Sequence, residues 1–242
     1  MPTDTTDTRV VLATAAGTPG WPNEDFAAVA PGAAVLLDGA TTMPRGTATG
    51  CQHGVAWYAR TLGVTLLAAL TGDPDTGLAD ALAASIADVR DRHAGTCDLD
   101  NPATPAATVT AVRAEPGRFC YLALSDSSIA ADYAGGRPPQ IITDDHRAAK
   151  ASPEVAAKAR TGTIDLDGLR GIALLSDGAT RITDLYGLVG WPELLTTVRD
   201  RGPRALIAEV RAAATADAAG RRWPRTKISD DATLIWWPVS PE

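Results

Sequence analysis

Acidic residues recur at the points where short apolar segments of this 242-residue chain begin or end. Five such points carry carboxylates: Asn23-Glu24-Asp25 before "FAAVA", Asp38 after "AAVLL", Asp126 after "CYLALS", Asp177 after "IALLS", and Asp230-Asp231 before "ATLIWW". Any one of them is a common turn residue. If one rim of a sheet collects them, they repel one another unless cations neutralise them. Mg²⁺ and Mn²⁺ take oxygen ligands, so the pattern favours a divalent metal site.

Two of these points share the same four residues, Asp-Gly-Ala-Thr, at 38–41 and at 177–180. A duplication would leave similarity beyond these segments, and none is found. Two unrelated turns stay an alternative, because Asp-Gly is a common turn pair. Metal binding by both segments also explains the repeated motif. A glycine after a ligating aspartate lacks a Cβ and lets a backbone carbonyl approach a metal closely.

The elements that must position these carboxylates are mostly short strands. Apolar runs bounded by Gly, Pro and Asp predict strands at 8–16, 26–39, 171–178 and 231–239, and an antiparallel meander over 106–143. Apolar residues at helical spacing predict helices over about 47–70, 76–93, 153–160, 191–198 and 203–218. Strands and helices do not alternate as βαβ units do, so we expect mainly antiparallel sheets with helices on their outer faces.

The composition is that of an ordinary globular protein and argues against several classes. Hydrophobic residues make up 45% and charged residues 21%, which suits one domain. The net charge of −7 and the dispersed Lys and Arg argue against a nucleic-acid partner. No apolar stretch is long enough to span a bilayer and the N-terminus lacks a secretion signal, so we expect a cytoplasmic protein with no membrane partner.

The cysteines and the grouped bases receive structural interpretations. Cys51, Cys97 and Cys120 are widely spaced and include no C-x-x-C pair. We expect them to be small buried apolar residues, with no histidine placed to complete a zinc site. The basic residues between Arg221 and Lys227 are expected to form a solvated loop.

Six motifs, taken in order, resemble the signature of the metal-dependent Ser/Thr protein phosphatases of the 2C type, the PPM family: "NEDF", "VLLDGAT", "ALSDSSIAA", "TDDH", "ALLSDGAT" and "SDDATLIWW". The resemblance runs from about Arg9 to Val239. It implies an α+β fold, a four-layer α-β-β-α sandwich of two mainly antiparallel sheets flanked by helices. It also implies one phosphatase domain over 1–242 with a flap excursion at 144–167, in which we interpret His146 as structural.

The resemblance implies a centre of two Mg²⁺ or Mn²⁺ ions, with a third, weaker ion in bacterial members. Asp38 would bridge the two metals, and the Gly39 carbonyl would ligate one of them. Asp177 and Asp230 would ligate the other ion, and Asp126 would help to bind the third. Asp38, Asp177 and Asp230 are therefore the implied catalytic set.

Three further acidic residues are expected to orient metal-bound waters: Glu24, Asp25 and Asp231, the last at the family's Asn position. The implied reaction is hydrolysis of a phosphomonoester. Two metals polarise the phosphate, and a water shared between them attacks phosphorus in line with the leaving Ser or Thr oxygen. The implied substrate is a phosphoprotein, and the implied opposing enzyme is a Ser/Thr kinase.

The chain departs from the family pattern in two places. Members usually carry an arginine a few residues before the Glu-Asp pair to hold the phosphate, whereas "GTPGWPNED" has no basic residue. Arg45 is a candidate replacement because an Arg fork matches phosphate oxygens, although a solvent-exposed Arg is the simpler interpretation. The second departure is Ala40 in "DGATTMPRG", which cannot act as a general acid. Two alternatives therefore stay open: a weak or inactive phosphatase-like binding module, and a phosphatase for a small phosphorylated molecule.

Overall fold

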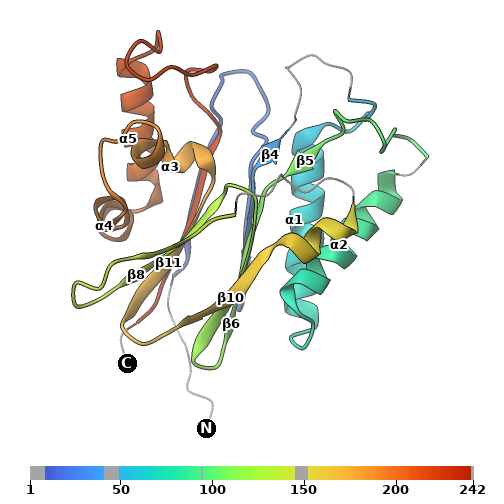
Figure 1. Cartoon of the computed structure of the whole chain (residues 1–242), viewed down its shortest axis with the longest axis horizontal. Helices are drawn as coiled ribbons and strands as arrows, with labels where there is room; N and C mark the ends of the chain where they lie inside the picture. Colours follow the sequence, from blue (N-terminus) through green and yellow to red (C-terminus); the bar gives the residue numbers. More distant parts are fainter. Residues whose placement is uncertain (1–8, 41–48, 94, 145–151, 241–242) are drawn as a thin grey trace.

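A computed structural model of the chain describes residues 9–40, 49–93, 95–144 and 152–240. Two five-stranded antiparallel sheets face each other, and helices cover the outer face of each sheet (Figure 1). The layers therefore run α-β-β-α, which confirms the expected α+β sandwich. In the described ranges no helix is long and apolar enough to cross a bilayer.

The first sheet combines strands from both ends of the chain in the order β1-β12-β11-β8-β9. Its strands are β1 (Val11–Ala15), β12 (Ala232–Pro238), β11 (Leu169–Leu175), β8 (Ser128–Tyr133) and β9 (Gln140–Ile142). Its outer face packs against three helices, α3 (Asp177–Asp184), α4 (Trp191–Arg201) and α5 (Pro203–Ala216). The carboxylates at 177 and 230–231 thus belong to the ends of this sheet.

The second sheet has the strand order β10-β7-β6-β3-β2. Its strands are β10 (Arg160–Asp165), β7 (Arg118–Leu124), β6 (Val109–Glu115), β3 (Ala33–Leu37) and β2 (Phe26–Ala30). Helices α1 (Val55–Gly72) and α2 (Leu78–His93) cover its outer face. A small ladder joins β4 (Gly39–Ala40) to β5 (Ala106–Ala107) directly after Asp38.

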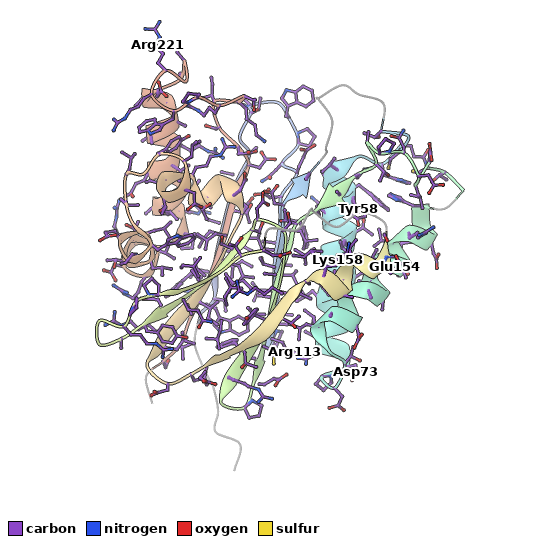
Figure 2. All side chains as sticks on the ribbon, in the orientation of Figure 1. Tyr58, Asp73, Arg113, Glu154, Lys158 and Arg221 are labelled. Carbon is purple, nitrogen blue, oxygen red and sulfur yellow. The ribbon has the colours of Figure 1, made fainter. Side chains whose placement is uncertain are left out.

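Alternation along strand β3 shows how one sheet serves two cores. Ala33, Val35 and Leu37 pack against the helices α1 and α2, whereas Ala34 and Leu36 face the other sheet. Successive strand residues point to opposite faces, so an almost continuous apolar run is what a doubly covered strand requires. Side chains fill the space between the two sheets (Figure 2).

The expected meander over 106–143 is divided between the sheets, because β6 pairs with β7 and β8 with β9, while β7 and β8 lie in different sheets. The chain crosses over at Ser125, whose φ of 72° is left-handed. The Ser125 N–H donates to Asp144 Oδ2 at 3.1 Å, and the Ser125 carbonyl accepts the Asp144 N–H at 3.1 Å. These two bonds hold a conformation that costs a non-glycine residue energy.

Other sequence predictions need smaller corrections. The excursion expected at 144–167 contains a 3-10 helix, η1 (Pro153–Lys158), close to the predicted helix. It also contains β10, which was not predicted and joins the edge of the second sheet. Helix α3 was not predicted either. His146 lies outside the described residues.

Candidate metal centre

Six of the sequence-predicted carboxylates converge at one end of the two sheets: Asp25, Asp38, Asp126, Asp177, Asp230 and Asp231. Asp38 follows β3, Asp177 follows β11 and opens α3, and Asp230 comes just before β12. Burial, and after it the negative charges of Asp25, Asp177 and Asp230, raises the pKa of Asp38 well above its usual range. Burial and the charge of Asp230 raise the pKa of Asp177, and Asp126 adds a smaller effect. The structure therefore collects mutually repelling carboxylates around Asp38.

Asp25 lies close to Asp38 and Asp231 and is shielded from solvent. Both of its carboxylate oxygens are shielded from solvent, and neither has a hydrogen-bond partner among the described residues. Burial is the largest influence and raises the pKa of Asp25 to about 6, with the charge of Asp231 adding to it. Thr233, Ser176 and Asp38 lie close enough to oppose this rise, although the two hydroxyls form their hydrogen bonds with Thr14 and with the Thr233 N–H. A buried carboxylate without partners is a group that a cation or its bound water would satisfy.

Asp230 is held by two basic side chains. Arg181 of α3 and Lys227 both form ion pairs with its carboxylate. Arg181 also lowers the pKa of Asp177, in opposition to burial and Asp230. The sequence interpretation missed Arg181, although its position four residues after Asp177 on one helix places the two on the same face. The acidic cluster thus contains its own counter-charge.

Glycines let the acidic segments approach one another closely. A Cβ on Gly39 would lie 2.5 Å from the carbonyl oxygen of Glu24, and a Cβ on Gly178 would lie 1.8 Å from the carbonyl oxygen of Asp231. The Gly39 N–H also donates to the Glu24 carbonyl at 3.1 Å. Both glycines of the repeated Asp-Gly-Ala-Thr are therefore needed for packing against the backbone of another acidic segment.

Ala40 and Arg45 are the residues connected with the two departures from the family pattern. Ala40 lies in β4, two residues after Asp38, and pairs with Ala106 of β5. Arg45 lies outside the described residues. Among the described residues, Arg181 forms an ion pair within the carboxylate cluster.

The expectation for the cysteines is wrong in two respects. All three are only partly buried. Cys51 and Cys97 lie together with His53 and His93, and the possible ligand atoms of these four residues are all within 4.8 Å of one another. The spacings Cys51-x-His53 and His93-x₃-Cys97 were visible in the sequence, but no spacing argument joins two pairs 40 residues apart.

The bases between 221 and 227 are only partly a solvated loop. Arg221 projects away from the molecule (Figure 2). The Arg225 side chain, in contrast, is only 5% exposed. It donates to Asp217 Oδ2 at 3.0 Å and to the Ala214 carbonyl at 2.9 Å, and so fastens the loop to the end of α5.

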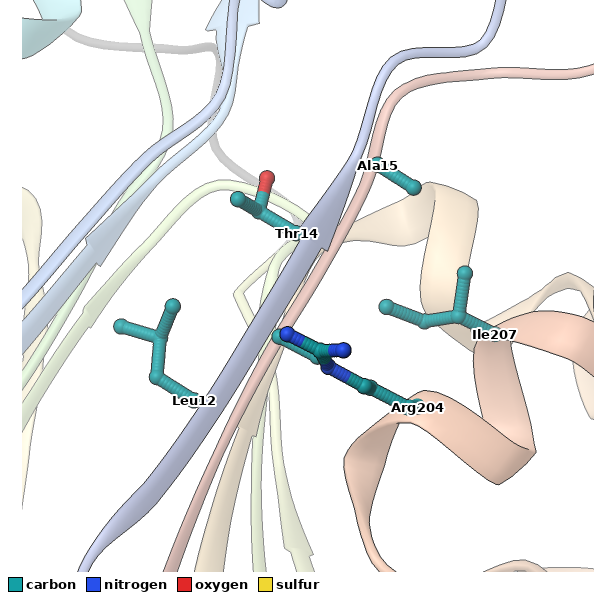
Figure 3. Close-up of a pocket in the computed structure, with 6 residues that line it drawn as sticks. Leu12, Thr14, Ala15, Arg204 and Ile207 are labelled. Carbon is teal, nitrogen blue, oxygen red and sulfur yellow. The ribbon is translucent and has the colours of Figure 1, made fainter.

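A separate pocket opens between β1 and α5 (Figure 3). Its lining combines four residues of β1 with Arg204 and Ile207 of α5. None of the carboxylates described above lines it. The pocket is therefore distinct from the carboxylate cluster.

The family model for protein phosphatase 2C matches residues 15–209 of the chain. A comparison with curated proteins gives no match. Among solved structures, the chain is similar to the serine/threonine phosphatase Stp1 from Staphylococcus aureus, with 13% identity and a TM-score of 0.65. That match covers 98% of this chain and 96% of Stp1.

Two further solved structures share this fold. The PPM Ser-Thr phosphatase MsPP from Mycobacterium smegmatis, in complex with cacodylate, is 19% identical with a TM-score of 0.61, over 96% of this chain and 98% of MsPP. The catalytic domain of the serine threonine protein phosphatase PstP, in complex with 2 manganese ions, is 14% identical with a TM-score of 0.59, over 96% and 98%. Sequence and fold lead to one conclusion: the chain belongs to the protein phosphatase 2C family.

Proposed function

We propose that the protein is a divalent-metal-dependent phosphatase that hydrolyses phosphoserine or phosphothreonine in proteins. The observation that carries this proposal is the carboxylate cluster, in which burial and three neighbouring carboxylates raise the pKa of Asp38. Such a cluster is stable at neutral pH only when protons or cations neutralise it. Membership of the family and the two manganese ions of the PstP catalytic domain support a metal as the cation.

The side chains fit hard divalent ions, which prefer carboxylate and carbonyl oxygens. Asp38 would help to hold both ions, the Gly39 carbonyl one of them, Asp177 and Asp230 the other, and Asp126 a weaker third. Asp126 is exposed. When bound, these ions supply Lewis acidity toward the phosphate and a lowered pKa for coordinated water.

Three neighbours position this centre rather than ligate it directly. Asp25 presents two buried oxygens without partners, which suits an acceptor for metal-bound water. Glu24 lies one residue before it and has its N–H fixed by Asp231 Oδ2 at 2.8 Å. We assign Asp231 the task of holding the Glu24-Asp25 segment against the start of β12.

One observation favours a second candidate, a weak or inactive phosphatase-like binding module. Asp230 is paired with Arg181 and Lys227, and these cations compete with a metal for its carboxylate. Ala40 also leaves no acidic side chain at that position to protonate the leaving group. The third candidate function is a phosphatase for a small phosphorylated molecule. The departure from the family pattern begins at Ala40, two residues after Asp38, where it could change which substrate fits.

The test is Mn²⁺ binding by calorimetry combined with phosphate release from p-nitrophenyl phosphate, phosphopeptides and small phosphate esters. We expect Mn²⁺-dependent release, fastest on phosphopeptides, and a loss of about 10²-fold or more in Asp38→Asn. Asp91→Asn, an exposed aspartate on α2, is the matched control. A wild-type chain that binds Mn²⁺ without hydrolysing any ester would be a binding module. Activity that survives Asp38→Asn would overturn the role given to Asp38.

A further inference from the structure

Four potential metal ligands meet where the α1–α2 layer is closed. Cys51 and His53 lie just before α1, His93 is the last residue of α2, and Cys97 follows it. The Cys97 Sγ is 3.4 Å from Cys51 Sγ and 3.4 Å from His53 Nδ1. The Cys51 Sγ is 3.6 Å from His93 Nε2 and 4.0 Å from His53 Nδ1.

These separations lie within about 0.4 Å of those in a tetrahedral zinc site. A zinc ion with Zn–S of about 2.3 Å and Zn–N of about 2.0–2.1 Å sets two sulfurs about 3.8 Å apart, and a sulfur and a nitrogen about 3.6 Å apart. A disulfide would instead need the two sulfurs at about 2.05 Å. Two cysteines and two histidines are also a common ligand set for zinc, whereas Mg²⁺ takes oxygen ligands.

Packing fixes the orientation of the two imidazoles. The Trp57 ring stacks on His53 with centroids 4.3 Å apart, and on His93 with centroids 4.7 Å apart. His93 is only 1% exposed. The His53 N–H also donates to Cys51 Sγ at 3.4 Å, as a backbone donor does to a ligating thiolate. Cys51, His53 and His93 are thus held in place by neighbouring side chains and backbone.

We propose that Cys51, His53, His93 and Cys97 bind one Zn²⁺ as a structural site, separate from the carboxylate cluster. Four protein ligands complete a tetrahedron and leave no position for water or substrate. The site ties the residues that enter α1 to the residues that leave α2, and the Asp98 N–H reinforces this tie by donating to the Gly50 carbonyl at 2.9 Å. Both segments belong to the connection between β4 and β5, beside the start of α1 (Figure 1).

The zinc site would be connected to the carboxylate cluster through the β4–β5 ladder. Strand β4 begins directly after Asp38 and pairs with β5, so the zinc would anchor the long connection between two strands that support Asp38. Metal removal should therefore loosen the helical layer and the β4–β5 ladder before it affects the first sheet. This proposal stands on the four side chains alone and does not depend on phosphatase activity.

The first test measures bound zinc in the full chain, purified with a thiol reductant and without added metal. We expect about one zinc per chain in the wild type, in Cys120→Ser and in Asp38→Asn, and none in the double variant Cys51→Ser/Cys97→Ser. Cys120 lies on β7 outside the cluster and is the matched cysteine control. Zinc that disappears in Asp38→Asn but stays in the double variant would overturn the proposal.

The second test does not depend on the folding of a variant. The wild-type chain, stripped by a strong chelator, is titrated with Co²⁺, which should give tetrahedral ligand-field bands and a thiolate charge-transfer band that saturate at about one ion per chain. Chelation should lower Tm by about 5 °C or more, and Zn²⁺ but not Mg²⁺ should restore it. A chain without these bands, or one whose Cys51 and Cys97 form a disulfide and bind no metal after reduction, would refute the site.

Discussion

The carboxylate of Asp231 accepts the backbone N–H of Glu24 at 2.8 Å and that of Gly17 at 2.7 Å. One side chain at the start of the last strand therefore fixes two points of the loop that carries the Glu-Asp pair. Each oxygen has its own donor, which an asparagine could not reproduce because its amide nitrogen is itself a donor.

Asp231→Asn should accordingly destabilise the protein by about 1–3 kcal/mol, because one part-buried N–H would then face another donor. Urea unfolding measures this change, and Asp91→Asn on the exposed face of α2 serves as the control. Metal affinity should also fall, since Glu24 and Asp25 would lose their fixed position. A variant with unchanged stability and affinity would contradict this role.

The glycine of the second Asp-Gly-Ala-Thr leads to a packing prediction. Gly178→Ala would place a Cβ 1.8 Å from the Asp231 carbonyl oxygen, which must then move. We expect a loss of about 1–3 kcal/mol or more. Gly72→Ala is a matched control, since a Cβ at that last position of α1 meets no atom within 4 Å, and it should change the stability by less than about 1 kcal/mol. Equal effects of the two substitutions in urea unfolding would show that close approach is not the reason for Gly178.

Arg181 offers a test of competition between a basic side chain and a metal. Arg181→Gln removes a cation from Asp230 and from the neighbourhood of Asp177. The Arg181 guanidinium and a Mn²⁺ ion held by Asp230 would repel each other. Mn²⁺ should therefore bind about 3–10-fold more tightly in this variant. Calorimetry measures the affinity, and Arg199→Gln, whose partner is Asp132, is the control. Weaker binding would show instead that Arg181 holds Asp230 in a ligating position.

Asp217 gives a pH dependence remote from the metal centre. Hydrogen bonds lower the pKa of Asp217 to about 2, first the Trp223 N–H, then the Arg222 N–H and the Arg225 guanidinium. A carboxyl whose folded pKa lies below its ordinary 3.8 stabilises the protein above that pH, and this contribution is lost as the pH falls toward about 2.

The stability difference between the wild type and Asp217→Asn should therefore be constant between about pH 5 and 8. Below about pH 4 it should shrink as both proteins become neutral at this position. Urea unfolding at a series of pH values measures the difference. A difference that persists unchanged at pH 3 would show that charge at Asp217 is not what holds the 221–225 loop.

Much of the centre could be predicted because strand ends are visible in a sequence. Asp38 and Asp177 each follow a short apolar run, and such runs end where the sheet ends. The structure adds that Asp177 also opens a helix, which the sequence interpretation missed because an eight-residue helix shows hardly two turns of periodicity. Arg181, which depends on that helix, was missed with it.

Contacts between distant segments were not predictable in the same way. The sequence pattern at 106–143 is the same whether β7 and β8 pair with each other or lie in different sheets, since both strands are buried on two faces. The crossover between the sheets depends instead on the contact between Ser125 and Asp144. The cysteine and histidine cluster likewise requires the antiparallel packing of α1 on α2. Sequence spacing shows the Cys51–His53 pair and the His93–Cys97 pair, but it contains no information about the distance between the two pairs in the fold.

The pairing of β1 with β12 has a consequence for the order of folding. Val11 lies opposite Trp236, so this ladder closes a loop of more than 200 residues, whereas all strands of the second sheet lie between Phe26 and Asp165. Loop-closure entropy makes such distant contacts slow to form. The helix-covered second sheet is therefore expected to assemble early, and the end of the sandwich where Asp230 meets Asp38 to become complete only in the last step.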